Sequence, residues 1–314
     1  MKALVFSGNP AQPVEFADVL DPVPAPDQAL VAVEAFSINR GDGFAMNGTY
    51  GSLPAAGSVR GQDVAGTVLR AAADGSGPTA GTRVVGKAAG GWAERVVIST
   101  SALATLPETV DVIAAAALPL AGLTAVRLRR AAGELTGQRL LITGAGGGVG
   151  HYLVELATAA GAIVTAVTSD PRAAEQLRRL GAHEVVSASE HTTGPFGVVM
   201  ESIGGQEFSN AAARLAPGGL ILWFGQASRQ PITLDFFSFL TAGTGFTLRH
   251  FAHFVSDHTD AEDLATLVAL MNTGRLHPQI GRTADWTDTP SVLADLMSRR
   301  IPGKAVLRIT AEPC

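Results

Sequence analysis

Residues 140–172 bring together a glycine-rich turn and the elements that could present it to a ligand. The stretch LLITGAGGGVGHYLVELATAAGAIVTAVTSDPR reads as an apolar strand, a turn, an amphipathic helix and a second strand. Free N–H groups and the dipole at a helix N-terminus attract phosphate, and glycines let the backbone approach it closely. The pattern therefore predicts a dinucleotide site, with a ligand-free tight turn as the alternative. The predicted phosphate-binding residues are Gly146, Gly147, Gly148, Val149 and Gly150.

The end of the second strand bears on which dinucleotide fits. NAD-binding proteins usually place a carboxylate there to bind the ribose hydroxyls. This strand ends with the small, neutral Thr168 and Ser169, and Arg172 follows just inside the next helix. Because Arg172 could pair with a 2′-phosphate, the sequence favours NADPH. Asp170 reads as the N-cap of that helix, before Pro171; its turning inward to bind the ribose of NADH is the alternative.

The order of elements predicts an α/β protein with two domains. Residues 1–115 carry short Val- and Ala-rich runs separated by Gly, Pro and Asp, which is typical of β-structure. Residues 116–255 alternate strands and helices, which predicts a doubly wound parallel sheet. Residues 256–314 hold two helices and a last strand, too little apolar material for a core of their own. We expect this tail to pack on the first domain.

The composition and charge of the chain limit the classes of partner that it is expected to bind. The 314 residues are 46% hydrophobic and 16% charged, with a net charge of −5 and no basic block, so a nucleic-acid partner is not expected. The longest apolar stretch is short and contains Pro119, and the N-terminus does not read as a signal peptide. We therefore expect a cytoplasmic protein with no membrane partner. Cys314 is the only cysteine, which excludes an internal disulfide and a four-cysteine zinc site.

Several stretches together resemble one enzyme family over essentially the whole chain. INRGDGFAMNGTY, RGQDVAGTV, LPLAGLTA, GAGGGVG, FGQAS and GKAVL are similar to those of the zinc-independent medium-chain dehydrogenases/reductases. Within that family they resemble the zeta-crystallin-like quinone oxidoreductases and the enoyl reductases. The resemblance implies a GroES-like β-rich catalytic domain (1–115 and 256–314) and a Rossmann NADP-binding domain (116–255). It also implies a homodimer, with GLILWFG and GFTLRHF as the candidate edge region.

The resemblance also implies roles for particular residues. Asn39 would lie near the nicotinamide, unless it only ends a strand and caps its own backbone. Tyr50 would donate a hydrogen bond or a proton to the substrate, unless it only lines the pocket mouth. Thr124, Phe224 and Gly225 would contact the cofactor. The aromatic side chains expected to wall the substrate pocket, unless they are ordinary core, are Phe44, Trp92, Phe251 and Phe254.

A metal route has little support in the sequence. Zinc-using relatives carry a cysteine in the first of these stretches and a histidine where this chain has Gln62, so no metal site is expected. RHFAHFVSDHTD, residues 249–260, reads as packing and a polar loop rather than a metal site. The prediction is an NADPH-dependent reductase of a small-molecule quinone, enone or enoyl thioester. A protein that binds NADPH without significant turnover is the alternative.

Overall fold

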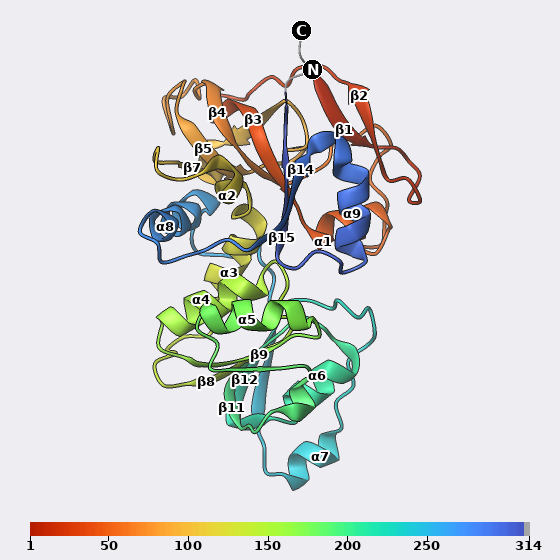
Figure 1. Cartoon of the computed structure of the whole chain (residues 1–314), viewed down its shortest axis with the longest axis vertical. Coiled ribbons are helices and arrows are strands. Elements are labelled where there is room, and N and C mark those ends of the chain that lie inside the picture. Colours follow the sequence, from red (N-terminus) through yellow and green to blue (C-terminus); the bar gives the residue numbers. More distant parts are fainter. Residues whose placement is uncertain (311–314) are drawn as a thin grey trace. The chain divides into compact units, whose positions relative to one another are not determined.

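The computed structural model describes residues 1–310 and divides into two compact units. Unit 1 comprises Met1–Leu123 and the chain from Asp257 onward, and unit 2 comprises Thr124–Ser256 (Figure 1). The first boundary thus falls after Leu123 rather than after residue 115. The second lies within one residue of the predicted position. Cys314 lies outside the described residues.

A seven-stranded sheet forms the centre of unit 1. Its path runs β14-β15-β3-β4-β5-β7, with β6 paired to β3. These strands are β3 (Gln28–Ile38), β4 (Asp63–Arg70), β5 (Arg83–Lys87), β6 (Arg95–Ser99), β7 (Leu103–Thr105), β14 (Ile280–Asp285) and β15 (Lys304–Arg308). A separate antiparallel pair joins β1 (Lys2–Phe6) to β2 (Val14–Asp18).

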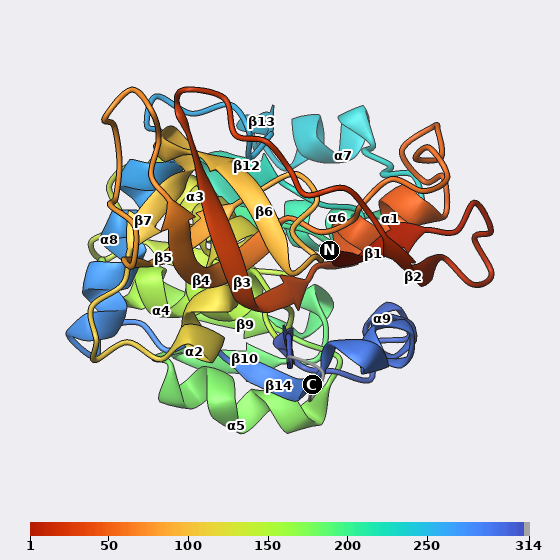
Figure 2. The ribbon, with the colours of Figure 1, turned by 90° about the horizontal axis from the view of Figure 1, so that it is seen from above.

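The long strand β3 organises this sheet. Its first half alternates buried and partly exposed residues, the period expected of a strand with one face on a core. One edge of β3 pairs with β4, and the first half of the other edge pairs with β6 (Figure 2). The second half of that other edge pairs with β15. As a result, a strand from the C-terminal part of the chain lies directly beside the end of β3.

Helices and the tail complete the core of unit 1. The helices are α1 (Arg40–Met46), α2 (Val112–Ala116), α3 (Pro119–Ala131, which crosses the boundary), α8 (Asp260–Asn272) and α9 (Thr289–Met297). Short 3-10 turns lie at η1 (Thr100–Ala102) and η3 (Trp286–Asp288). Trp286, Val292, Leu293 and Leu296 pack with strand residues such as Phe36 in one buried cluster. The tail therefore supplies part of the apolar surface that unit 1 buries.

Unit 2 confirms the predicted doubly wound fold. All six strands are parallel, in the order β10-β9-β8-β11-β12-β13. They are β8 (Arg139–Ile142), β9 (Ile163–Val167), β10 (Glu184–Val186), β11 (Phe196–Glu201), β12 (Leu215–Trp223) and β13 (Phe246–His250). The helical elements are α4 (Gly150–Ala159), α5 (Pro171–Arg179), η2 (Ser189–His191), α6 (Gly205–Ala212) and α7 (Phe236–Thr241). The order reverses between β8 and β11, so right-handed crossovers place α4 and α5 on one face and α6 on the other (Figure 1).

Some elements differ from the sequence-based expectation. Helix α7 and strand β14 were not predicted, because one is a short aromatic run and the other carries Gly281, Arg282 and Asp285. Strand β12 pairs on both sides, so of the two segments predicted to form a sheet edge only the one in β13 does so. Across residues 1–310, every helix falls short of the length and apolarity that crossing a bilayer requires.

Candidate functional site

The glycine turn after β8 is packed so tightly that side chains would not fit at two of its positions. A Cβ at Gly150 would lie 2.5 Å from Ala145 Cα and 2.6 Å from the Gly144 oxygen. A Cβ at Gly146 would lie 2.8 Å from Thr168 Oγ1. Gly150 begins α4, so its missing side chain lets the N-terminal turn of that helix approach the strand. This is the close helix–strand packing that a dinucleotide-binding turn requires.

A buried carboxylate supports the turn from the neighbouring strand. Glu201 ends β11 and has no exposed surface. Its Oε1 accepts hydrogen bonds from Thr143 Oγ1 at 3.2 Å, from the N–H of Ile203 at 2.7 Å and from that of Gly204 at 3.0 Å. Burial raises the pKa of Glu201 to about 6, although these hydrogen bonds oppose the shift. Glu201 therefore joins the ends of β8 and β11 at the point where the strand order reverses.

The residues after β12 lie against this same point. The N–H of Phe224 donates to the backbone carbonyl oxygen of Glu201 at 2.9 Å, and a Cβ at Gly225 would lie 3.0 Å from the backbone carbonyl oxygen of Ser202. Open parallel sheets bind ligands outside the carboxyl ends of their strands at such a reversal. The close-packed glycines and the helix N-terminus fit a pyrophosphate, so the residues present are those that a dinucleotide needs. Thr124 lies on α3 and is buried.

The end of β9 carries an ion pair. Asp170 is the N-cap of α5, as predicted, and accepts from the N–H of Arg172 at 3.0 Å. The guanidinium of Arg172 also turns back onto this carboxylate, with Nη2 2.8 Å from Asp170 Oδ2. The hydrogen bond from Arg172 lowers the pKa of Asp170. Thr168 Oγ1 accepts from the N–H of Asp170, and Ser169 is exposed.

In unit 1, Asn39 belongs to a buried polar network. Its Nδ2 donates to Asp63 Oδ2 at 2.7 Å, and its Oδ1 accepts from Lys304 Nζ at 2.5 Å. Lys304 Nζ also lies 3.1 Å from Asp63 Oδ2. Asn39 does follow a strand and precede α1, but its side chain makes no cap hydrogen bond. The side chain is instead committed to Lys304 and Asp63.

Two further groups of unit 1 lie beside Asn39. Asp42 Oδ2 accepts from the N–H of Asn39 at 2.8 Å, and Oδ1 accepts from Gln62 Nε2 at 3.2 Å. Burial raises the pKa of Asp42 to about 6. The Tyr50 hydroxyl lies over the start of α1, since a Cβ at Gly41 would be 3.3 Å from it. Tyr50 is 66% exposed, and the partial loss of water around its hydroxyl, followed by the charge of Asp42, raises its pKa.

The predicted pocket walls separate into different environments. Phe44 is half-buried and meets the Tyr50 ring edge to face, with centroids 6.3 Å apart. Trp92 is 0% exposed and packs in the core of unit 1, which favours the alternative that it is an ordinary core residue. In a sequence, a large aromatic residue beside a glycine looks the same whether it lies in a core or lines a pocket. Phe251 is half-buried and Phe254 is mostly exposed.

The histidine-containing stretch 249–260 does not gather ligands. Within residues 1–310, no group of three or more His, Cys, Asp or Glu side chains could hold a metal ion. His253 and Phe254 contact each other edge to face, and His258 lies 3.8 Å from the buried Asp263. Packing and loop contacts account for these side chains.

Four of the charged residues described above were not singled out from the sequence: Asp42, Asp63, Glu201 and Lys304. Asp63 and Lys304 are the first residues of strands, and Glu201 is the last residue of one. Asp42 lies in the helix turn that follows β3. A charge set directly against a buried apolar run is the signal that could have found them, because such a charge must be paired or hydrogen-bonded.

Comparison with known proteins gives the same organisation. Residues 25–108 match the alcohol dehydrogenase GroES-like domain, and residues 148–272 match the zinc-binding dehydrogenase family. Despite that name, the stretch INRGDGFAMNGTY holds no cysteine, and Gln62 stands where zinc-using relatives are expected to carry a histidine.

Individual relatives are more specific. The chain is 30% identical to quinone oxidoreductase from Sus scrofa over 306 residues, which covers 93% of this chain and 92% of that protein. It is 32% identical over 303 residues to the spectinabilin polyketide synthase system protein NorB from Streptomyces orinoci, covering 90% of this chain but 13% of that protein. A mycobacterial structure in complex with NADPH superposes with a TM-score of 0.85 at 27% identity, covering 98% of this chain and 100% of that one. The chain therefore belongs to the quinone oxidoreductase group of the medium-chain dehydrogenases/reductases.

Proposed function

We propose that this protein is a zinc-independent, NADPH-dependent reductase that transfers hydride to a quinone or to an activated C=C of an enone or enoyl thioester. The observation that carries the proposal is that one chain holds both a close-packed dinucleotide turn, in unit 2, and, in unit 1, Asn39 before α1 with the Tyr50 hydroxyl over the start of that helix. Family membership supports the class of reaction, and the NADPH complex of the mycobacterial relative supports the cofactor.

The cofactor would be held by unit 2. The turn from Gly146 to Gly150 and the first N–H groups of α4 would bind the pyrophosphate. Phe224 and Gly225, after β12, would contact the carboxamide end, and Thr124 on α3 would contact the nicotinamide. When bound, NADPH would supply the hydride.

Arg172 would select NADPH over NADH. A 2′-phosphate is a stronger partner for a guanidinium than a single carboxylate is, so it would draw Arg172 away from Asp170. Thr168 and Ser169 add no negative charge against that phosphate. Asp170 remains near enough to compete for Arg172, which moderates the selectivity.

The substrate oxygen would be held by unit 1. Negative charge develops on a carbonyl oxygen when hydride reaches the ring or alkene carbon conjugated to it, and preorganised donors stabilise that charge. Asn39 Nδ2 and the Tyr50 hydroxyl are two donors of the catalytic unit beside the start of α1, since Asn39 precedes that helix and the hydroxyl lies over Gly41. The ordinary pKa of a phenol, 10.0, already keeps Tyr50 protonated at neutral pH, and the shift is upward, so the hydroxyl can give a hydrogen bond or a proton. Phe44, packed against Tyr50, would form an apolar wall, as would Phe251 and Phe254.

Steady-state turnover tests the proposal. Purified protein is mixed with NADPH and either 1,4-quinones or conjugated enones, and loss of the reduced cofactor is followed by absorbance with and without a chelator. We expect turnover with at least one of these two substrate classes, and we expect the chelator to leave the rate of NADPH oxidation unchanged. Tight NADPH binding without turnover of either class would favour the cofactor-binding alternative, and a rate abolished by the chelator would contradict a zinc-independent reaction.

We further propose that two copies associate through the β13 edge. In the part of the chain that the structure describes, β13 pairs only with β12, so its outer edge has no strand partner. Around that edge Phe236, Phe237 and Leu240 are exposed by 69%, 70% and 63%. An unpaired edge beside exposed aromatic side chains is complementary to a second copy of itself, which could extend the sheet across a twofold axis.

A further inference from the structure

The network around Asn39 is assembled by three neighbouring strands. Strand β15 runs antiparallel to β3 with Ala305 opposite Ile38, which sets Lys304 beside Asn39. On the other edge of β3, Asp63 of β4 is opposite Ser37. Lys304 and Asp63 are 241 positions apart in the sequence, and the sheet register brings both onto one amide group.

The chemistry of the two charged partners dictates how that amide is turned. A lysine ammonium only donates, so it must face the Asn39 oxygen; an ionised carboxylate only accepts, so it must face the nitrogen. The contacts agree, with Lys304 Nζ on Oδ1 at 2.5 Å and Nδ2 on Asp63 Oδ2 at 2.7 Å. A flipped amide would put donor against donor and acceptor against acceptor. Nδ2 has two hydrogens, and within residues 1–310 only one of them is used.

The charged pair is rigidly held. Lys304 is 2% exposed and Asp63 is 0% exposed. Asp63 Oδ2 also accepts from Ser37 Oγ at 2.6 Å, and Oδ1 accepts from the N–H of Leu120 at 2.8 Å. A buried carboxylate with this many donors cannot reorient without leaving several of them unsatisfied.

We propose that Lys304 and Asp63 are positioning residues, which turn the Asn39 amide so that its one remaining N–H is available to the substrate's carbonyl oxygen. The inference rests on the proposed function, because it assumes that Asn39 acts as a donor in the reduction. In this role Asn39 donates to the substrate through Nδ2, because Lys304 on Oδ1 and Asp63 on Nδ2 fix which way the amide faces. The favoured substrates then present an oxygen acceptor, as quinones, enones and enoyl thioesters all do.

The test is a double-mutant cycle on single-turnover hydride transfer. Lys304→Met keeps the length of the side chain and removes its charge, and we expect the rate to fall about 10- to 100-fold, in the range below the loss of a whole donor. The dissociation constant for NADPH, followed by its fluorescence, should change by less than about 3-fold, because the proposed phosphate contacts lie in unit 2. Lys304→Arg keeps a donor and a charge and should recover part of the rate.

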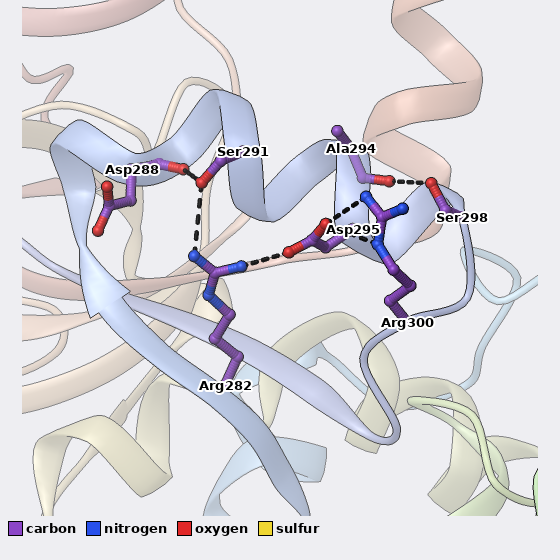
Figure 3. Close-up of polar contacts among 7 residues, drawn as sticks. All are labelled: Arg282, Asp288, Ser291, Ala294, Asp295, Ser298 and Arg300. Atoms are coloured by element: carbon purple, nitrogen blue, oxygen red, sulfur yellow. Dashed lines mark hydrogen bonds and ion pairs between the residues drawn. The ribbon is translucent and has the colours of Figure 1, made fainter.

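A matched control comes from an ion pair elsewhere in unit 1. Arg282 of β14, the strand next to β15, contacts Asp295 of α9, and Arg300 contacts the same carboxylate (Figure 3). None of these side chains touches the Asn39 network. Arg282→Met removes a strand cation from an ion pair, as Lys304→Met does, and should leave the hydride-transfer rate unchanged.

The decisive comparison is made in the Asn39→Ala background. If Lys304 acts through Asn39, adding Lys304→Met to Asn39→Ala lowers the rate no further; if the two losses multiply, the positioning role is wrong. If Asn39→Ala alone leaves the rate unchanged, the donor role of Asn39 in the proposed function fails instead. Should Lys304→Met not fold because Asp63 is left unpaired, the cycle is run with Lys304→Met/Asp63→Asn, which removes both charges together. The same criterion applies: a rate loss that persists in the Asn39→Ala background overturns the inference.

Discussion

The side-chain amide of Gln62 donates a hydrogen bond to the buried carboxylate of Asp42, with Nε2 and Oδ1 3.2 Å apart. Gln62 stands where zinc-using relatives are expected to carry a zinc ligand, and in this protein its side chain instead donates a hydrogen bond to a carboxylate. Among residues 1–310, the donors to the Asp42 carboxylate are this amide and the N–H of Asn39, at 2.8 Å. That is little compensation for a buried anion, which is why burial dominates its raised pKa.

The raised pKa of Asp42 predicts a stability that depends on pH. The folded-state pKa is about 6 against an ordinary value of 3.8, so the folded protein binds this proton more tightly than the unfolded chain does. The stability from the neutral acid is present below about pH 4 and is lost as pH rises through about 6. Asp42→Asn keeps the neutral form at all pH values. Its free energy of unfolding relative to the native sequence should therefore rise between pH 4.5 and 7.5, by about 2 kcal/mol.

Asp295 provides the control for this measurement. Its pKa is lowered, chiefly by the hydrogen bond from Arg300, so it is ionised throughout that pH range. Urea unfolding of Asp295→Asn should give the same difference from the native sequence at pH 4.5 and 7.5. An equal difference at both pH values for Asp42→Asn as well would show that Asp42 is not perturbed by burial.

The cofactor assignment predicts an asymmetric effect at Arg172. Arg172→Glu replaces the proposed partner of the 2′-phosphate by a repelling charge, so the KM for NADPH should rise about 10-fold or more while that for NADH changes little. Arg179→Glu, on the same helix and paired with Glu175, is the matched control and should affect neither. Equal changes for both cofactors at Arg172 would mean that it does not read the phosphate.

A related prediction concerns Asp170. Removing its charge while keeping a cap, as in Asp170→Ser, releases Arg172 from the ion pair. Steady-state kinetics should then show a higher ratio of kcat/KM for NADPH over NADH than in the native protein. A lower ratio would indicate that Asp170 orients Arg172 toward the phosphate rather than competing for it.

The packing of the glycine turn predicts a steric effect at Gly150. In Gly150→Ala the new Cβ meets backbone atoms of Gly144 and Ala145, which cannot move aside as a side chain could. We expect about 1–3 kcal/mol of lost stability and a weaker affinity for NADPH. Gly245→Ala adds a Cβ in open space in the same unit, and calorimetry should give this control variant a Tm close to that of the native protein. Native-like melting and binding of Gly150→Ala would rule out this account of the turn.

The proposed dimer predicts a change in molar mass. Leu248 lies on β13 and is 38% exposed, so Leu248→Lys puts a charge at the edge that would meet the partner. Light scattering should show a dimer for the native chain and a monomer for this variant. Leu69→Lys changes a similarly exposed leucine on β4 and should stay dimeric. A native chain that scatters as a monomer would remove the proposed interface.

Sequence patterns predicted those parts of the molecule that depend on neighbours in the chain. The glycine turn, the alternation of strands and helices in unit 2 and the Asp170 cap each involve residues a few positions apart, so local sequence specifies them. The family resemblance pointed to Asn39 and Tyr50, and the structure brings both to the start of α1.

Contacts between distant parts of the chain could not be predicted from local sequence patterns. Lys304 meets Asn39 only because β15 pairs with the end of β3, and a sequence does not state which strands are neighbours. The same holds for the core position of Trp92: the residue type indicates that burial is favourable, but not which distant segments of the chain cover the side chain. Strand β14 forms because β15 offers it an edge, despite a polar sequence.

The measurement that tests the central claim most directly is stopped-flow oxidation of NADPH, deuterated at the transferred position, by an enone and by a quinone in the presence of a chelator. The account predicts a primary isotope effect with at least one acceptor and a rate that the chelator does not change. A cofactor that binds but is not oxidised by either acceptor, or a rate that disappears on chelation, would contradict it.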